Sequence, residues 1–475
     1  MRPVRLAVVG VILLGGCAVG PNYERPATTP VAAEWRDTTA SRDSSFANIP
    51  WWQVLGDTTL QRMIRQSLKE NRDIHLALAR VNEARALLGI QRLEYFPQIN
   101  VQGGLRKSDG ADSLLTGVTN TEMGYLGIGL SWELDLWGRL RRLNEAAAAE
   151  LLASEQGRRA MILTVVSEVA RAYTEMVELD AQVALTDTQT VVRRASLELA
   201  RARFQGGLTS EMDVRQGENA LAVAEGSHAR ALRQRAQKEN ELSVLMGRVP
   251  GAVPRGTLPL LQQISTTEIP AGLPSQLLAR RPDVRQAEEQ LRAANARIGA
   301  AVAAMFPTIS LTATGGTISD ELGDLGSSGT GFWRITPNLF LPLLNMGRNR
   351  RQVAAERART EAAVANYERT VLNAFREVED ALVAVRLLRQ EAEAAGRAAT
   401  AARLGVNLAA MRYEGGVDNY LALLDAQRAQ LESGLQESGM QRSYRVAVIQ
   451  LYKALGGGWD PVTDTLAVPR SRSGP

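Results

Sequence analysis

Few side chains in this 475-residue sequence are of the types that catalyse reactions or bind metals. The two histidines, His75 and His228, lie in separate helical segments, and neither has carboxylates or a cysteine grouped with it. We therefore expect each to be a helix surface residue rather than a ligand. The sequence Arg280-Arg281-Pro282-Asp283 indicates the start of a helix at the proline. Without a phosphate loop, zinc spacing or nucleophile elbow, we expect no enzyme and no cofactor or metal site.

Charge and composition narrow the class further. The formal net charge is +4, from 55 basic and 51 acidic side chains, and the basic residues form no cluster. Nucleic-acid binding therefore has little support. Only 5% of residues are aromatic, while Ala, Leu, Arg, Glu and Gln are abundant, which favours helices.

The only cysteine, Cys17, follows a segment typical of protein export. Two arginines precede an apolar run that ends in LGGC and is too short to remain as a membrane-spanning helix. These residues resemble the bacterial lipobox, in which the cysteine is lipidated and becomes the mature N-terminus. The alternative is an ordinary signal with an incidental cysteine. Since Ala18 follows, and not Asp, we expect an outer-membrane lipoprotein with a covalent lipid on Cys17.

Two similar turns occur in the sequence. Residues 203–218 read RFQGGLTSEMDVRQGE and residues 412–427 read RYEGGVDNYLALLDAQ, an offset of 209 (416 minus 207) between the second glycines. Each glycine pair can end a helix with positive φ. Thr209 and Asp418 are suitable N-caps for the returning helix. Each turn therefore predicts the tip of a helical hairpin.

Only the second turn places a carboxylate, Asp425, beside a stripe of leucines; the matching residue in the first copy is Gln216. The apolar residues there have coiled-coil spacing and predict seam or core positions: Val417, Leu421, Leu424, Leu431 and Leu435. By itself, this pattern favours an exposed Asp425 that pairs with Arg428 three residues later.

Further repeated landmarks show that the chain is duplicated. Phe96-Pro97 matches Phe306-Pro307, Gly138-Arg139 matches Gly347-Arg348, and Leu245-Met246-Gly247 matches Ala454-Leu455-Gly456. Chance similarity does not keep one register over several landmarks.

Long helices are expected in both halves, because residues 140–203 and 348–412 contain no proline. Roughly 64 residues of helix would reach about 95 Å, which requires partners along the whole length. We expect shorter helices at 57–95, 209–246, 275–304 and 418–455.

Between these helices the hydrophobic period changes to two. Apolar and polar residues alternate in four segments, 98–108, 123–136, 308–318 and 331–342, with Gly-, Ser-, Thr- and Asp-rich loops at 107–121 and 317–330. Strands of roughly ten residues with one apolar face are typical of transmembrane barrels. Trp132, Trp137 and Trp333 near the strand ends suit an interfacial girdle. A soluble pair of hairpins is the alternative.

Four strands cannot close a barrel, because about eight are needed and open edges are not tolerated in lipid. The long helices also require partners. Both features predict an oligomer.

The lipobox, the duplicated plan and the turn GVDNYLALLDAQ together resemble the outer-membrane efflux proteins of the TolC type, in the lipoprotein branch that serves resistance-nodulation-division pumps. The resemblance covers residues 17–460. It implies a mainly α fold with transmembrane β structure: a homotrimer with a twelve-stranded β-barrel continued by a long periplasmic α-helical barrel. It also implies a periplasmic adaptor and an inner-membrane transporter as partners, and a bacterial outer-membrane location with outer-membrane lipid around the barrel.

The resemblance also assigns site residues. It implies a periplasmic gate with Leu421 as an apolar ring and Asp425 as an acidic ring. Arg412 and Tyr413 are candidates for a latch. Adaptor docking falls on the two tips, where turn chemistry alone is the alternative: Gly206, Gly207, Leu208, Thr209, Ser210, Gly415, Gly416, Val417, Asp418 and Asn419.

The expected organisation is a signal peptide (1–16), an anchor and equatorial segment (17–56), a first repeat (57–247), an inter-repeat equatorial segment (248–274), a second repeat (275–456) and a C-terminal equatorial segment (457–475). The expected function is the passive exit duct of a tripartite pump for drugs and other small molecules. A duct for protein or metal export, or a lipid-anchored coiled-coil scaffold without a pore, remains as an alternative.

Overall fold

The computed structural model describes residues 18–26, 35–36, 56–108, 121–256, 274–319, 324, 331–342 and 346–457. Cys17 and most of the two loops expected at 107–121 and 317–330 lie outside these residues. The chain divides into two compact units, which are described separately. Unit 1 comprises residues 1–28, 79–155 and 286–369, and unit 2 comprises residues 29–78, 156–285 and 370–475.

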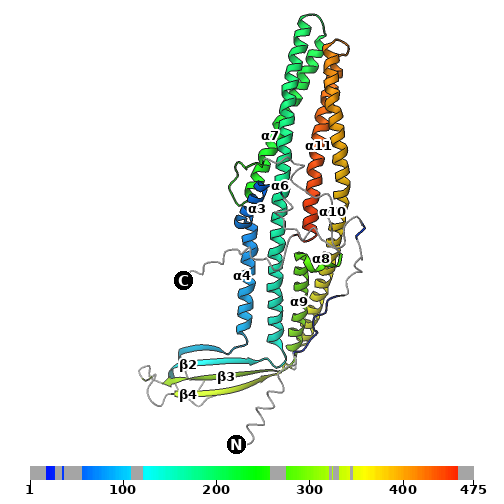
Figure 1. Ribbon diagram of the computed structural model, residues 1–475. Coiled ribbons are helices and arrows are strands. Elements are labelled where there is room, and N and C mark those ends of the chain that lie inside the picture. Colours follow the sequence, from blue (N-terminus) through cyan, green and yellow to red (C-terminus); the bar gives the residue numbers. More distant parts are fainter. Residues whose placement is uncertain are drawn as a thin grey trace. The chain divides into compact units, whose positions relative to one another are not determined.

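A four-stranded antiparallel sheet belongs to unit 1 (Figure 1). Its strands are β1 (Gln98–Ser108), β2 (Thr121–Leu134), β3 (Thr308–Ser319) and β4 (Gly331–Phe340), in the spatial order β1-β2-β3-β4. β1 and β2 come from the first half of the chain, and β3 and β4 from the second. The strands therefore lie within two residues of the predicted segments.

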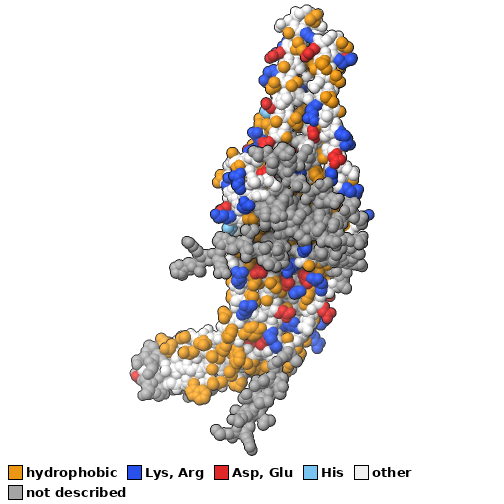
Figure 2. Space-filling view, in the orientation of Figure 1, with side chains coloured by type: hydrophobic (Ala, Val, Ile, Leu, Met, Phe, Trp, Pro, Cys, Tyr) orange, Lys and Arg blue, Asp and Glu red, His pale blue; other side chains and the backbone are white. Residues whose placement is uncertain are grey.

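The strand register divides the sheet into an apolar face and a polar face. Residues directly opposite one another share a face. One row across the sheet is wholly apolar and consists of Ile99, Leu130, Ala313 and Ile335. The neighbouring polar row consists of Gln98, Ser131, Thr312 and Thr336. Many apolar side chains of the sheet are exposed in this chain, and Figure 2 shows hydrophobic side chains gathered over the strands.

The three tryptophans expected at the strand ends differ in environment. Trp132 Nε1 donates to the Tyr95 carbonyl at 2.9 Å. Trp137 Nε1 donates to the Pro307 carbonyl at 2.7 Å, and its ring stacks on Phe306 with centroids 4.8 Å apart. Trp333, in contrast, is 80% exposed. The indole rings of Trp132 and Trp137 are therefore hydrogen-bonded to the segments just before β1 and β3, whereas the ring of Trp333 is exposed.

The helices follow the same order in both halves. The first half contains α3 (Thr58–Glu70), α4 (Arg72–Leu93), α6 (Arg139–Gln205) and α7 (Glu211–Leu245). The second half contains α8 (Pro274–Arg280), α9 (Pro282–Ala303), α10 (Arg348–Glu414) and α11 (Tyr420–Ala454). Both long helices have 67 residues and both returning helices have 35, which demonstrates the duplication.

The prediction of single helices at 57–95 and 275–304 was wrong, because each is broken once. Asn71 ends α3 and caps α4, since its Oδ1 accepts hydrogen bonds from the amides of Asp73 and Ile74 at 2.9 and 3.2 Å. Its Nδ2 donates to the Leu245 carbonyl at 2.9 Å, which fixes the break against α7. In the second half, the break precedes Pro282, which has no amide hydrogen to donate.

Unit 2 contains a hydrophobic core with a buried polar centre. Residues of α3, α6, α7 and α11 form this core, among them Leu60, Val169, Met176, Leu242 and Ile449. Tyr173 OH donates to Asp57 Oδ2 at 2.7 Å and accepts from the Gly256 amide at 2.9 Å. Burial raises the pKa of Tyr173, and the hydrogen bond to Asp57 raises it as well. Asp57 also caps α3, so one buried tyrosine joins three segments.

Among the described residues, none of the helices combines the length and the apolar composition needed to span a membrane.

Glycine allows close contact between β2 and β3. A Cβ on Gly316 would lie 2.3 Å from the Leu126 carbonyl oxygen and 2.5 Å from Gly127 Cα. We expect Gly316→Ala to cost about 1–3 kcal/mol of unfolding free energy, measured by urea titration of the detergent-solubilised protein. Gly331→Ala is the control, because its nearest atom would be 4.0 Å away. Equal losses for both variants would contradict this account of the contact.

Tyr173→Phe should destabilise unit 2 by about 1–3 kcal/mol, because the Gly256 amide and the Asp57 carboxylate lose a buried partner. Tyr420→Phe is the matched control. Tyr420 is equally buried, but its hydroxyl has no hydrogen-bonding partner among the described residues, so its removal should be neutral or stabilising. Urea unfolding of both variants tests the difference, and a larger loss for Tyr420→Phe would refute it.

Candidate functional site

The two hairpin tips have the same backbone geometry, and both belong to unit 2. Gly207 and Gly416 both have φ +70°. The Leu208 amide donates to the Arg203 carbonyl at 2.9 Å, and the Val417 amide donates to the Arg412 carbonyl at 2.9 Å. This is the hydrogen bonding of a helix that ends at a left-handed glycine. Both predicted turns are therefore helix ends of one kind.

The predicted N-caps were wrong by one residue. The caps are Ser210 for α7 and Asn419 for α11, both with extended backbone. Asn419 Oδ1 accepts from the Ala422 amide at 3.0 Å. The hydroxyl of Thr209 instead donates to the carboxylate of Asp213. Since the turn extends one residue further than the spacing indicated, Thr209 and Asp418 remain outside the helices.

Arg412, a candidate for a latch, forms an ion pair with Asp418 in the same turn. Its Nε lies 2.5 Å from Asp418 Oδ2, and its Nη2 lies 3.0 Å from Asp418 Oδ1. The hydrogen bond from Arg412 lowers the pKa of Asp418. This bidentate ion pair explains why Asp418 does not cap α11.

Tyr413, the second latch candidate, is buried between the hairpins. Its ring lies 5.4 Å from that of Tyr420. The guanidinium carbon of Arg203 lies 4.4 Å from the Tyr413 ring centre. Arg203 also donates to the carbonyls of Tyr413 and Glu414 at 3.1 and 3.2 Å. Arg203, which occupies the position in the first turn that Arg412 occupies in the second, therefore joins the first tip to the second.

The expected gate residues lie together at the start of α11. Leu421 is 48% exposed, and Asp425, one turn later, is also exposed. Arg428, the partner expected for Asp425, instead binds Glu432 with Nε and Oε1 2.8 Å apart. The structure therefore presents an apolar and an acidic side chain on one exposed face near the second tip.

The predicted seam at the start of α11 was only partly right. Leu424 is buried, but Val417 and Leu421 are exposed. The buried positions there are instead Tyr420, Leu423, Leu424 and Gln427. At the start of α11, the face that meets the rest of the chain therefore shares only Leu424 with the predicted stripe.

The other predicted tip residues are at the surface or partly exposed. Leu208 is 79% exposed and Val417 is 67% exposed, at matching places in the two turns. An apolar side chain is thus presented to the surroundings at each tip.

Sequence reasoning missed a group of polar side chains between α6 and the start of α11. Arg193, on α6, is only 9% exposed, and its Nη2 donates to the Leu424 carbonyl at 3.2 Å. Gln189 and Ser196 lie on the same face of α6 and contact Gln427. The spacing i, i+4, i+7 places all three on one face. The sequence alone does not say that this face is buried.

The histidines bind neighbouring polar groups. His75 Nε2 lies 2.9 Å from the Lys69 carbonyl oxygen, and His228 Nδ1 lies 3.2 Å from Thr186 Oγ1. In the part of the chain that the structure describes, no group of three or more His, Cys, Asp or Glu side chains is arranged to hold a metal.

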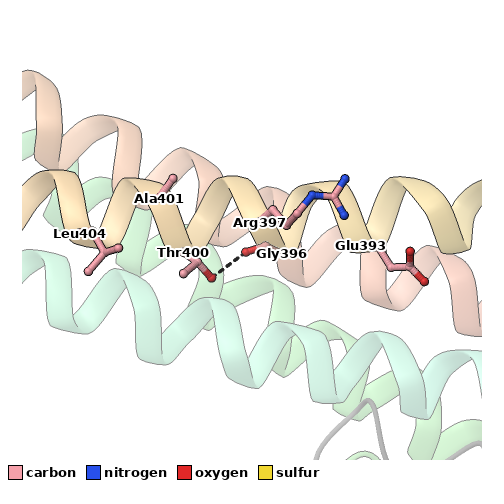
Figure 3. A pocket seen from close by; sticks show the side chains of 6 residues that line it. All are labelled: Glu393, Gly396, Arg397, Thr400, Ala401 and Leu404. Atoms are coloured by element: carbon pink, nitrogen blue, oxygen red, sulfur yellow. Dashed lines mark hydrogen bonds between the residues drawn. The ribbon is translucent and has the colours of Figure 1, made fainter.

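A shallow groove follows one face of α10 (Figure 3). Its lining residues all come from this helix: Glu393, Gly396, Arg397, Thr400, Ala401 and Leu404. Thr400 Oγ1 donates to the Gly396 carbonyl at 2.8 Å, so the hydroxyl is satisfied within the helix. Small side chains between longer ones make a surface into which another helix can pack.

Comparison with known proteins identifies the family. The model of the family "Outer membrane efflux protein" matches residues 63–248 and 273–457, once in each half. Outer membrane protein OprJ of Pseudomonas aeruginosa is 38% identical over 464 residues, covering 96% of this chain and 95% of that protein. Antibiotic efflux pump outer membrane protein ArpC of Pseudomonas putida is 37% identical, covering 95% of this chain and 94% of that protein.

A solved structure has the same fold as this chain. The crystal structure of a membrane protein from Pseudomonas aeruginosa superimposes with a TM-score of 0.86 at 36% identity, covering 93% of this chain and 98% of that one. The fold, the duplicated plan and the family model lead to the same conclusion. The chain belongs to the outer membrane efflux proteins and is an outer-membrane channel of a bacterial efflux pump, not an enzyme.

Proposed function

We propose that this chain forms a homotrimeric exit duct through which a tripartite pump releases antibiotics and other small organic molecules. The observation that carries the proposal is the sheet, whose apolar face is exposed and whose outer strands β1 and β4 are each bonded on one side only among the described residues. Family membership supports the efflux role, and the name of the relative ArpC supports antibiotics as a substrate class.

The edges of the sheet support an assembly of several copies. Among the described residues, β1 pairs only with β2, and β4 only with β3. In lipid, the free amides and carbonyls of β1 and β4 need strand partners. Three copies supply twelve strands, enough to close a barrel with the apolar face toward lipid. The groove on α10 offers a surface for a helix of a neighbouring copy.

The gate in this proposal is made of Leu421 and Asp425. Around a threefold axis, three leucines would narrow the passage and exclude hydrated solutes. Three carboxylates one turn away would favour cations. The exposure of both side chains within a single chain supports this role, since an inward-facing ring has to be free of contacts within the chain.

The tips are the proposed contact with a periplasmic adaptor, which in turn meets an inner-membrane transporter. Exposed Leu208 and Val417 give each tip one apolar contact at the same place in the turn. Apolar groups exposed beside polar ones are typical of interaction sites. Arg412 and Tyr413 serve in this proposal as the latch that keeps the second tip in one shape, through Asp418 and Arg203.

A covalent lipid on Cys17 completes the proposal. The residues after it are bound within unit 1: the Val19 amide donates to the Trp137 carbonyl at 3.1 Å, and Asn22 accepts from Arg142 at 2.8 Å. A Cβ on Gly138 would lie 2.7 Å from Ala18 Cα. The chain is therefore held at the end of β2 directly after Cys17, which favours anchoring beside the barrel.

Channel recordings test the gate. In planar bilayers, the wild-type protein should conduct poorly, and Leu421→Ala with Asp425→Ala should raise the conductance on the order of tenfold, because the narrow ring is removed. The control is Arg428→Ala with Glu432→Ala, which removes a pair from the same helix further from the tip. If the gate variant stays closed, the gate lies elsewhere; if no variant forms pores, the duct proposal fails.

Metabolic labelling tests the lipid. Cells given radioactive palmitate should label the wild-type protein, whereas Cys17→Ser should remove the label completely, because the chain has no other cysteine. Immunoblots of both proteins control for expression. Label on the Cys17→Ser protein would refute lipidation at this residue.

A further inference from the structure

The polar face of the sheet carries few charged side chains. Successive residues of a strand point to opposite faces, and residues directly opposite each other on neighbouring strands share a face. Glu133 lies two residues after Ser131 of the polar row and is therefore on the polar face. Arg334 lies two residues before Thr336 of the same row and is therefore also on it. Among the sheet residues whose side chains the structure describes, Glu133 and Arg334 are the charged ones on this face.

The carboxylate of Glu133 is neutralised by an arginine at the start of α6. Arg139 Nε donates to Glu133 Oε1 at 2.9 Å, and Arg139 Nη2 donates to Glu133 Oε2 at 2.7 Å. A bidentate pair of this kind is one of the stronger hydrogen-bonded arrangements in proteins. Asp135, just after β2, is also paired, with its Oδ2 3.3 Å from Arg141 Nε. The acidic residues at the helical end of the sheet therefore contribute little net charge.

Arg334 is a positive charge without such a partner. Its side chain is exposed, and no carboxylate pairs with it in the part of the chain that the structure describes. Across the sheet, its row consists of Thr314, Gly129 and Asn100, which are all uncharged. The row that contains Glu133 lies about 13 Å further along the strands, beyond the screening length of about 10 Å in 0.1 M salt. A guanidinium remains protonated in proteins, so the charge is permanent.

Glycines leave the surroundings of Arg334 open. Gly129 lies in the same row across the sheet, and Gly127 and Gly316 face each other in the next row. These three residues have no side chain that could cover or bind the guanidinium. The charge of Arg334 is therefore presented to the space in front of the polar face.

In the proposed duct, the apolar face of the sheet meets lipid and the polar face lines the passage. β4 begins at Gly331, directly after the expected outer loop 317–330, so Arg334 lies toward the exit. A threefold axis places three copies of this arginine at one height. Rings of arginine or lysine favour the passage of anions.

We propose that Arg334 is a specificity-determining residue of the duct, where three copies form a ring of positive charge that favours anions over cations of similar size. This inference rests on the proposed trimeric duct. It concerns the barrel and not the gate of Leu421 and Asp425, whose acidic ring has the opposite preference.

Reversal potentials in planar bilayers test the ring, with Leu421→Ala and Asp425→Ala present in every variant to keep the passage open. With Arg334 in place, chloride should permeate roughly two- to fivefold better than potassium at about 0.01 M salt. The two ions should permeate almost equally at about 1 M salt, because the screening length falls from about 30 Å to about 3 Å. Arg334→Gln should remove the preference, Arg334→Glu should invert it, and Arg334→Lys should keep it.

A second variant separates the charge from other effects of the substitution. Thr314 lies directly opposite Arg334 on the same face, so Thr314→Arg added to Arg334→Gln should restore the preference for chloride. If the variants conduct but Arg334→Gln and Arg334→Glu leave the permeability ratio unchanged, the ring is refuted while the duct stands.

A thiol reaction tests the ring without conductance. In protein reconstituted into lipid vesicles, Thr314→Cys places a thiol opposite Arg334. At about 0.01 M salt, a negatively charged methanethiosulfonate should react there at least roughly twofold faster, relative to a positively charged one, than it does after Arg334→Gln. The unsubstituted protein, which contains only Cys17, gives the background.

Ile335→Cys is the matched control, because the residue after Arg334 lies on the apolar face, where lipid should prevent the reaction. If Ile335→Cys reacts as fast as Thr314→Cys, the polar face does not line a passage through lipid, and the duct proposal fails. If Thr314→Cys reacts but its preference does not depend on Arg334, only the ring is refuted.

Discussion

Backbone amides and carbonyls at the edges of β1 and β4 need hydrogen-bonding partners, and in lipid only other strands can supply them. The faces of the sheet, its edges and the long helices can all be related to this requirement. The register gives the sheet one apolar face, which suits a non-aqueous surrounding, and the edges of β1 and β4, unpaired among the described residues, are the basis of the proposed trimer. The duplicated plan supplies two strand hairpins and two helical hairpins per chain, so one assembly can close the sheet and provide partners for the long helices.

Duplication preserved the backbone of the tips but not their side chains. Gly207 and Gly416 share one φ value and one hydrogen-bonding pattern, because both end a helix in the same way. The side chains that follow differ: the first tip places Thr209 on Asp213, whereas the second pairs Asp418 with Arg412. Identical turns therefore carry different surfaces, and only the second copy has the side chains of the proposed gate.

Unit 2 contains two buried groups of polar side chains that differ in how completely they are hydrogen-bonded. Around Tyr173, the hydroxyl both donates and accepts, and it joins α3, α6 and the segment ending at Gly256. Around Arg193, several buried atoms lack hydrogen-bonding partners among the described residues. Local stability in a protein varies with how completely such groups are satisfied. The first group is therefore the better stabilised of the two.

Much of the fold was predictable from local patterns. Alternation of period two located all four strands to within two residues, and the absence of proline indicated both 67-residue helices. The prediction failed where a single side chain bound a group that the local pattern does not indicate. Asn71 breaks a helix by binding the Leu245 carbonyl, and the α11 cap lies at Asn419 because Asp418 binds Arg412.

The sequence by itself determined the duplication, the strand faces and the position of the two helical turns, because these depend on residues close together in the chain. The tertiary structure alone decided which face of each long helix is buried. A helix of mixed polar and apolar residues has several faces that could pack, and the choice depends on residues more than two hundred positions away, as for Arg193 and Leu424. For that reason, Leu421 and Asp425 could be named from the sequence through a family resemblance, whereas Gln189, Arg193 and Ser196 could not.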